Sequence, residues 1–341
     1  MEKTEAFYQK LPKVELHRHL EGSLRIKTMM DIARAHGITV PAATAPLSNL
    51  VQIQQDDPYT YQNFLAKFTT LRLFYRSPEV IHRVTREAVE DAARDNVRYM
   101  ELRFTPVALS RAERFPLGDV MDWVCESAQK AAGEFGIRVA LIASANRNES
   151  VELAEQVAWL AADRIGKGLV GLDLAGNEVE FSTKPFVGVF HEANQAGLKL
   201  TIHAGEWAGA ANVREAIEVF SAERIGHGVR VLEDPETVRL ARERGTTFEV
   251  CVTSNYQTGA TPSLDQHPLM KMIEQGLNVT LGTDDPSISQ ITLSDEYRRA
   301  CEDLGMPRQM LKERILAAAR ASFLADSTRE ALVNELKKEL A

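Results

Sequence analysis

The chain has 341 residues, of which 44% are hydrophobic and 26% are charged, the composition of an ordinary globular protein with enough apolar material for a core. Its formal net charge of −8, without any block of lysine and arginine, argues against a nucleic-acid-binding surface. No apolar run approaches the length that spans a membrane, and the N-terminus lacks the apolar segment of a signal peptide. The three cysteines are widely separated, which indicates reduced thiols, so we expect a cytoplasmic protein.

The first strand is expected at residues 13–19, because its first half alternates polar and apolar residues. It ends in two histidines at positions i and i+2, and this spacing directs both imidazoles to one face of a strand. A helix is expected at residues 24–36, whereas residues 41–57 are rich in Pro, Ala, Thr and Ser and are expected to form a loop. Two more helices, at residues 61–75 and 78–95, complete a helical insertion between the first two strands, in a position suited to a lid.

From residue 96 onward, strands and helices alternate regularly. The remaining strands are expected at residues 96–106, 137–145, 169–175, 198–203, 224–227, 246–252 and 277–283. Helices are expected at residues 117–135, 150–165, 185–196, 208–220, 235–244, 268–275, 293–303, 307–323 and 328–340. Eight strands that alternate with helices predict an α/β fold, a (β/α)8 TIM barrel with extra helices after strand one and at the C-terminus, and residues 1–341 form its single domain.

The competing fold is an open, doubly wound sheet, which commonly carries a glycine-rich phosphate-binding turn after its first strand. No GxGxxG follows the first expected strand and no GxxxxGK[ST] occurs in the sequence, and this absence favours the barrel. In a barrel the carboxyl ends of all eight strands surround one opening, so residues far apart in the sequence meet there.

The chemically reactive residues share one property, because each lies at or just after the carboxyl end of an expected strand. They are His17 and His19 on the first strand, His203 and Glu206 on the fifth, His227 on the sixth, and Asp284 and Asp285 on the eighth. Taken alone, each has an ordinary alternative: a chance histidine pair, a hydrogen-bonded core histidine, or an acidic turn or helix cap before proline. Their matching placement favours a common site. The remaining histidines lack this placement and are expected to be surface or structural residues: His36, His82, His191 and His267.

The expected site has the donors of a catalytic zinc centre, which binds imidazole and carboxylate and keeps one position for water. Three nitrogens and one oxygen come from His17, His19, His203 and Asp284. Zinc lowers the pKa of its bound water to about 7, so hydroxide is available at neutral pH. Glu206, His227 and Asp285 are then left to orient the hydroxide, to protonate the substrate and to hold it.

Motifs along nearly the whole chain match one known family. In order they read KVELHRHLEGS, VRYMELRFTP, GLDLAGNE, HAGE, RIGHG, EVCVTSNYQTGA, LGTDDP and ASFL. The chain thus resembles the adenosine deaminase family of the amidohydrolase superfamily, whose members are metal-dependent purine deaminases. Related barrel hydrolases that bind two metal ions use a modified lysine at the end of strand four, but residues 174–178 here contain no lysine. One zinc ion per chain is therefore expected.

The resemblance implies a role for each site residue. Glu206 matches the acid that protonates purine N1, and His227 matches the residue that orients the zinc hydroxide. Asp285 matches the carboxylate that hydrogen-bonds the hydroxide and contacts the N7 side of the purine, and Gly176 matches the glycine whose backbone N–H meets purine N3. The implied zinc ligands are His17, His19, His203 and Asp284. The implied substrate contacts are His19, Glu21, Gly176 and Asp285.

The implied reaction is the hydrolytic loss of the 6-amino group of adenosine, and of 2′-deoxyadenosine, as ammonia, by attack of zinc hydroxide on purine C6. Adenosine deaminases commonly carry Asp where this chain has Glu21, and relatives that deaminate free adenine or aminodeoxyfutalosine often read HLEG. Residues 253–260 and the TDDP motif look like the nucleoside-deaminating branch. We therefore expect a purine nucleoside as the partner, with no nucleic acid and no membrane. The alternative substrate is free adenine or another 6-aminopurine such as aminodeoxyfutalosine.

Two functions of other classes compete with this one. A metal-dependent hydrolase that does not deaminate could use the same barrel, because a fold alone does not fix the reaction. A catalytically inactive purine-binding protein would lack a metal ligand or the acid, whereas the whole set is present here. The PCxxC signature of the smaller cytidine-type zinc deaminases is absent from the sequence.

Overall fold

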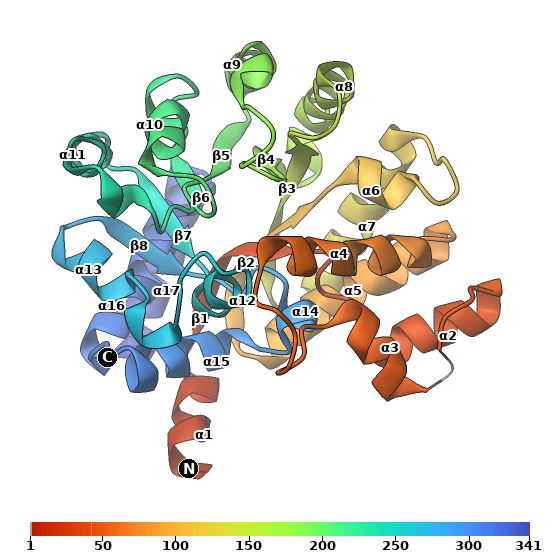
Figure 1. Ribbon diagram of the computed structural model, residues 1–341, viewed down its shortest axis with the longest axis horizontal. Coiled ribbons are helices and arrows are strands. Elements are labelled where there is room, and N and C mark those ends of the chain that lie inside the picture. The colour runs from red at the N-terminus through yellow and green to blue at the C-terminus, as the bar shows by residue number, and fades with distance from the viewer. Residues whose placement is uncertain (1, 42) are drawn as a thin grey trace.

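The structure is a computed structural model that describes residues 2–41 and 43–341, and at its centre lies a sheet of eight parallel strands (Figure 1). After β8 the chain returns to β1, where the N–H of His19 donates to the carbonyl of Asp284 and the N–H of Asp284 donates to the carbonyl of His17. These bonds join the two ends of the sheet, so the predicted TIM barrel is confirmed. In chain order around the barrel, the strands are β1 Lys13–His19, β2 Val97–Phe104, β3 Arg138–Asn146, β4 Leu169–Ala175, β5 Lys199–Ala204, β6 Arg224–His227, β7 Thr247–Val250 and β8 Asn278–Leu281.

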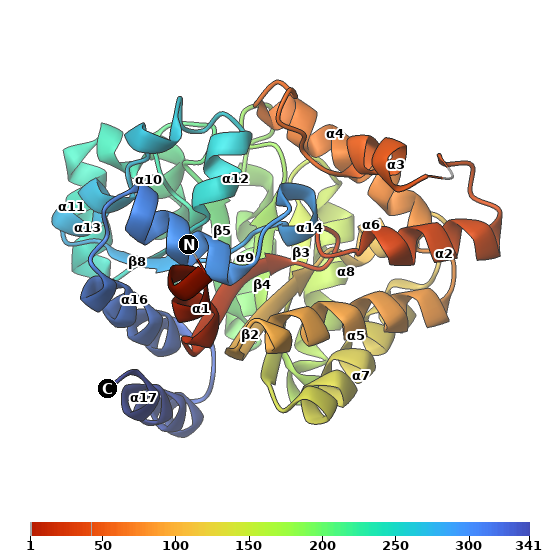
Figure 2. The same ribbon diagram turned by 90° about the horizontal axis from the view of Figure 1, so that it is seen from below.

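Helices surround the sheet and connect successive strands (Figures 1 and 2). The helix α1 Glu2–Lys10 precedes β1, and the insertion between β1 and β2 contains α2 Ile26–His36, α3 Thr44–Val51, α4 Tyr61–Leu71 and α5 Pro78–Arg94. The later connections contain α6 Pro106–Ser110, α7 Leu117–Phe135, α8 Val151–Ala162, α9 Val187–Gln195, α10 Ala210–Glu218, α11 Pro235–Arg244, α12 Val252–Gln257 and α13 Leu269–Glu274. After β8 come α14 Pro286–Ser289, α15 Leu293–Arg298, α16 Arg308–Ala321 and α17 Asp326–Leu340.

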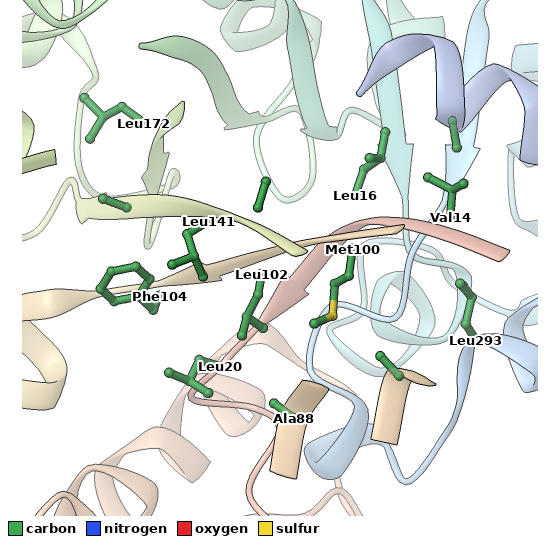
Figure 3. Close-up of a cluster of buried hydrophobic side chains, with 14 of the residues drawn as sticks. Val14, Leu16, Leu20, Ala88, Met100, Leu102, Phe104, Leu141, Leu172 and Leu293 are labelled. Carbon is green, nitrogen blue, oxygen red and sulfur yellow. The ribbon is translucent and has the colours of Figure 1, made fainter. Parts of the chain in front are cut away.

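The strands alternate apolar and polar side chains because their two faces meet different surroundings. The outward face packs on the helices: Figure 3 shows Leu102 of β2 on the same side of the sheet as Ala88 of α5, with Leu20 beside them. The inward face carries charged groups, among them Arg103 on β2 and Glu249 on β7, which are fully buried and joined by a hydrogen bond of 2.7 Å. The interior is therefore a polar lining, unlike the stacked branched side chains that usually fill such barrels.

The insertion between β1 and β2 departs from one prediction. The prediction that residues 41–57 form a loop throughout is wrong, because α3 occupies eight of these positions; position 42 lies outside the described residues. Leu47 and Val51 of α3 are buried, so tertiary packing outweighs a composition that favours a loop. Pro46 is tolerated because it lies in the first turn, where backbone N–H groups have no partner within the helix.

The other predicted elements are present, and their ends shift by a few residues. The seventh strand ends at Val250 rather than at residue 252, because the chain turns into α12. The helix predicted at residues 293–303 is α15 followed by a π-helical turn, Arg299–Asp303. The short helices α6, α12 and α14, and α1 at the N-terminus, have no counterpart in the predicted set. In the part of the chain that the structure describes, no helix is both long and apolar enough to cross a membrane.

Candidate active site

A cavity of about 390 Å³ opens at the carboxyl ends of the barrel strands, with α4 of the insertion forming part of its wall. His17 lies behind the cavity, with Nε2 3.2 Å from Oδ1 of Asp284. The structure thus brings together the residues that the sequence analysis assigns to the site. Those that line the cavity are His19, Glu21, Gly176, His203, Glu206, His227, Asp284 and Asp285.

Four donor groups meet at one end of this cavity. Oδ1 of Asp284 lies 3.2 Å from Nε2 of His17 and 3.3 Å from Nε2 of His19. Nε2 of His19 lies 3.4 Å from Nε2 of His203. The four side chains come from β1, from β5 and from the turn after β8, so closure of the barrel is what brings them together.

Two buried carboxylates determine which ring nitrogen carries the proton in His17 and in His203. Nδ1 of His17 donates to Glu249 at 2.8 Å, and Nδ1 of His203 donates to Asp173 at 2.9 Å. The proton of each neutral ring is thereby held on Nδ1, so the Nε2 lone pairs face Asp284 and the neighbouring rings. Within the described residues, buried Nε2 of His17 has no hydrogen-bond partner. Acceptors this close together repel one another unless a cation lies among them, and the donor set therefore fits a bound metal ion.

Arg103 joins the two supporting carboxylates. Its guanidinium donates to Glu249 at 2.7 Å and to Asp173 at 3.4 Å, and Arg224 approaches the other oxygen of Glu249 at 2.6 Å. Burial acts to raise the pKa of Glu249, but the positive charges of Arg103 and Arg224 hold this pKa well below its usual range. Glu249 therefore stays ionised and accepts a hydrogen bond from the Nδ1–H group of His17.

Glu206 lies in a different electrostatic environment. Burial, together with the negative charges of Asp284 and Glu178, raises the pKa of the Glu206 carboxyl group well above its usual range. Its Oε2 lies 3.5 Å from Nε2 of His227. A buried carboxylic acid that keeps its proton and lines a ligand-sized cavity is suited to act as a general acid.

The carboxylate of Glu178 fixes the turn that carries Glu206. It accepts hydrogen bonds from the backbone N–H groups of Gly205 at 2.9 Å, Glu206 at 2.7 Å and Ala208 at 2.9 Å, and also from that of Trp207. Four backbone donors on one carboxylate hold the turn after β5 in a single conformation. Glu178 is therefore a positioning residue for the acid.

Two glycines permit close approaches in the cavity wall. A Cβ atom at Gly22 would lie 1.8 Å from Oδ1 of Asp285, so a larger residue at position 22 would displace that side chain. Gly176 has a φ of +94°, which favours glycine, and a Cβ atom there would lie 3.0 Å from Oδ1 of Asn148. Gly176 thus presents its backbone to the cavity.

The carboxyl group of Asp285 has an unusual protonation state. Burial and the charge of Asp284 raise the pKa of this group well above its usual range. Asp285 therefore presents to the cavity a carboxyl group that keeps its proton.

Glu21 and the insertion form the other end of the cavity. Oε1 of Glu21 accepts from the N–H of Thr105 at 2.7 Å, whereas Oε2 is buried without a hydrogen-bond partner among residues 2–41 and 43–341. Burial raises the pKa of Glu21. The ring of Tyr61 on α4 stacks on Trp207 with centroids 4.9 Å apart, which ties the insertion to the turn that carries Glu206. The remaining wall here is supplied by Phe64, Leu65, Phe68 and Arg72.

Several supporting residues are missing from the set predicted from the sequence. Asp173 and Glu249 were detectable in principle, because each is the single charged residue of a short apolar strand, where an unpaired charge would be costly. Arg103 stands out less, because β2 carries two further charged residues, Arg98 and Glu101. Glu178 carries no such signal, because it follows a strand and its partners are mainly backbone N–H groups. These residues lie inside the motifs quoted above, but no spacing rule assigns them to the site.

Comparison with known proteins identifies the family. The family model described as adenosine deaminase matches residues 12–339. This chain belongs to the adenosine deaminase family. It is 36% identical over 330 residues to the adenosine deaminase of Klebsiella pneumoniae, and the match covers 96% of this chain and 98% of that protein. As a member of the adenosine deaminase family, it is a hydrolase that acts on carbon–nitrogen bonds.

Solved structures extend the likeness to the whole barrel. The adenine deaminase of Arthrobacter aurescens matches with a TM-score of 0.89 at 26% identity, covering 97% of this chain and 99% of that one. An amidohydrolase from Burkholderia ambifaria with bound Zn matches with a TM-score of 0.90 at 27% identity, covering 98% of this chain and 92% of that one. Deaminases of this superfamily depend on a metal, and the buried histidine–aspartate cluster of this family member has the donors to bind one.

Proposed function

We propose that this member of the adenosine deaminase family hydrolyses adenosine to inosine and ammonia, and acts likewise on 2′-deoxyadenosine. The observation that carries the proposal is the presence, in one cavity, of a buried protonated acid and a cluster of histidines and aspartate. Loss of a 6-amino group needs both, since a proton on ring N1 makes C6 electrophilic and an activated water must then attack C6. The Klebsiella pneumoniae relative, named adenosine deaminase, supports a nucleoside as the substrate.

The proposed metal is one zinc ion. When bound, zinc lowers the pKa of its water to about 7 and so makes hydroxide available at neutral pH. Glu249 and Asp173 keep Nε2 of two of the histidines available for the metal, and the Zn in the Burkholderia ambifaria structure supports the choice of ion. The lack of a lysine in residues 174–178 supports a single ion. The proposed ligands are His17, His19, His203 and Asp284.

The side chains of the protein would carry the proton transfer. Glu206 keeps its proton at neutral pH and would donate it to purine N1 as water attacks C6. The ionised carboxylate that results would be stabilised by the hydroxyl of Thr258, which donates to Oε1 of Glu206 at 3.3 Å. Nε2 of His227, 3.5 Å from Glu206, would orient the attacking oxygen.

The substrate would be held along the length of the cavity. The backbone N–H of Gly176 would donate to purine N3, and Asp285 would contact the attacking oxygen and the N7 side of the ring. The rings of Phe64 and Phe68 would cover the apolar faces of the nucleoside. Glu21, whose Oε2 has no partner within the described chain, would contact the sugar.

Free adenine, or another 6-aminopurine such as aminodeoxyfutalosine, is the second candidate substrate. The observation that favours it is Glu21, which is one methylene longer than the aspartate common in adenosine deaminases and so occupies more of the sugar end of the cavity. The structural likeness to the Arthrobacter aurescens adenine deaminase supports the same reading.

The test is a substrate panel of adenosine, 2′-deoxyadenosine and adenine with the zinc-loaded enzyme, followed by ultraviolet absorbance and ammonia release. We expect kcat/KM to be highest for adenosine and the Glu206→Gln variant to keep zinc while kcat falls roughly 10²- to 10⁴-fold. Turnover of adenine but not of adenosine would reject a nucleoside as the substrate. Inactivity towards every member of the panel would reject deamination of these purines.

A further inference from the structure

A hydrogen-bonded chain leads from a backbone N–H group to the Nδ1 side of His227. Its side chains are buried, with exposed fractions of 1% for His227, 0% for Asn255 and 6% for His267. The N–H of Leu269 lies 3.1 Å from Nδ1 of His267, and Nε2 of His267 lies 3.3 Å from Oδ1 of Asn255. Nδ2 of Asn255 then lies 3.1 Å from Nδ1 of His227. The chain connects the start of α13, through α12, to the end of β6.

The direction of each bond follows from the first one. A backbone N–H can only donate, so Nδ1 of His267 accepts from Leu269 and carries no proton. Burial lowers the pKa of His267 to about 3, so at neutral pH the ring is neutral and its single proton lies on Nε2. This N–H donates to Oδ1 of Asn255 and thereby turns the amide N–H groups of Asn255 toward His227.

Nδ1 of His227 is therefore an acceptor. A neutral ring that accepts at Nδ1 carries its proton on Nε2, the nitrogen that lies 3.5 Å from Oε2 of Glu206 in the cavity wall. In this tautomer the ring presents a hydrogen-bond donor to the cavity and has no lone pair there to accept a proton.

We propose that Asn255 and His267 are positioning residues that fix His227 in the tautomer with its proton on Nε2. His227 then donates a hydrogen bond to the attacking oxygen and does not serve as the base. His267, predicted to be a surface or structural residue, acts on the site through Asn255 alone. The tautomer stands independently of the proposed function, whereas its effect on turnover rests on that function.

Nitrogen-15 NMR of the zinc-loaded enzyme with labelled histidine rings measures the tautomer directly, because protonated and unprotonated ring nitrogens have well-separated signals. Loss of one ring's signals in His227→Gln assigns them. We expect the proton on Nε2 of His227 in the wild type. A proton on Nδ1 of His227 overturns the proposal whether or not the enzyme deaminates adenosine, so the two proposals fail separately.

Asn255→Asp is the matched variant, since aspartate keeps the shape of asparagine but accepts at both oxygens. It favours a proton on Nδ1 of His227 and so removes the donor from the cavity. We expect the NMR signals to show this change and kcat to fall roughly 10²-fold or more with little change in KM. An altered tautomer with wild-type kcat, or an unaltered tautomer, overturns the proposal.

His267→Gln and His267→Leu separate hydrogen bonding from packing. Glutamine can place an amide N–H near the position of Nε2, whereas leucine fills space without donating. We expect the glutamine variant to recover most of kcat and the leucine variant to lose it, while His191→Leu, at an exposed histidine, keeps the wild-type kcat. Equal losses in both His267 variants, at equal zinc content, contradict the proposed role of the His267 donor.

Discussion

The two ends of the cavity differ in how firmly the protein holds their side chains. The inner end carries the proposed zinc ligands, and the outer end carries Glu21 and residues of the insertion. At the inner end, His17 and His203 are each tied at Nδ1 to a buried carboxylate, and Arg103 joins those carboxylates across the barrel. At the outer end, Glu21 has one bonded oxygen, and Nε of Arg72 is buried without a hydrogen-bond partner in the described residues. The strand ends thus fix the reactive groups, while the insertion, which can vary independently of the barrel, would surround the part of the proposed substrates in which they differ.

Removal of an inner-end ligand should give the largest effect. His17→Ala removes one of the hydrogen-bond donors to Glu249 and one nitrogen from the proposed zinc site. We expect zinc content and deaminase activity to be lost together, and treatment of the wild type with a chelator should give the same joint loss. The exposed His36→Ala is the control and should keep both. An active His17→Ala enzyme without zinc would remove the metal from the proposal.

A supporting carboxylate should matter less than a ligand. Asp173→Asn keeps the shape of the side chain but no longer enforces a proton on Nδ1 of His203. We expect zinc affinity to fall about 10- to 100-fold, measured by competition with a chelator, and activity to return when zinc is added in excess. Wild-type zinc affinity in this variant would show that the hydrogen bond between Asp173 and His203 does not contribute to metal binding.

Glu178→Gln should change the pH dependence. In the proposed mechanism Glu206 acts in its protonated form, so activity should be present below its pKa and should be lost as pH rises through it. Loss of the negative charge at position 178 lowers this raised pKa, and we expect the alkaline limb of kcat to move to lower pH. The exposed Glu180→Gln is the control and should leave the limb in place. An alkaline limb that does not move in Glu178→Gln would exclude Glu178 as a source of the shift.

The smallest effect should come from the outer end. Glu21→Asp shortens a side chain that has one bonded oxygen. We expect zinc content and the shape of the pH profile to stay as in the wild type, while the ratio of kcat/KM for adenosine to that for adenine changes about tenfold. A constant ratio would remove Glu21 from substrate selection.

The way in which each residue is positioned also explains how much of the fold and of the site could be predicted from the sequence. The barrel and the convergence of the reactive residues follow from strand periodicity, because each residue lies at a strand end and a barrel brings those ends together. Asp173 and Glu249 could not be matched to particular histidines, since their partners lie on other strands and depend on the register of the sheet. The helix α3 could not be predicted either, because its stability comes from the burial of Leu47 and Val51 rather than from local propensity.

The stacking of Tyr61 on Trp207 provides an optical reporter within the native chain. Trp207 lies one residue after the proposed acid, and its ring lies against α4 of the insertion. A ligand that enters beneath α4 changes the surroundings of this indole, so its fluorescence emission should change with occupancy. The other tryptophans, Trp123 and Trp159, lie on α7 and α8 outside the cavity lining. A Trp207→Phe variant should lose the response, and substrate binding could then be followed separately from turnover, without an added dye.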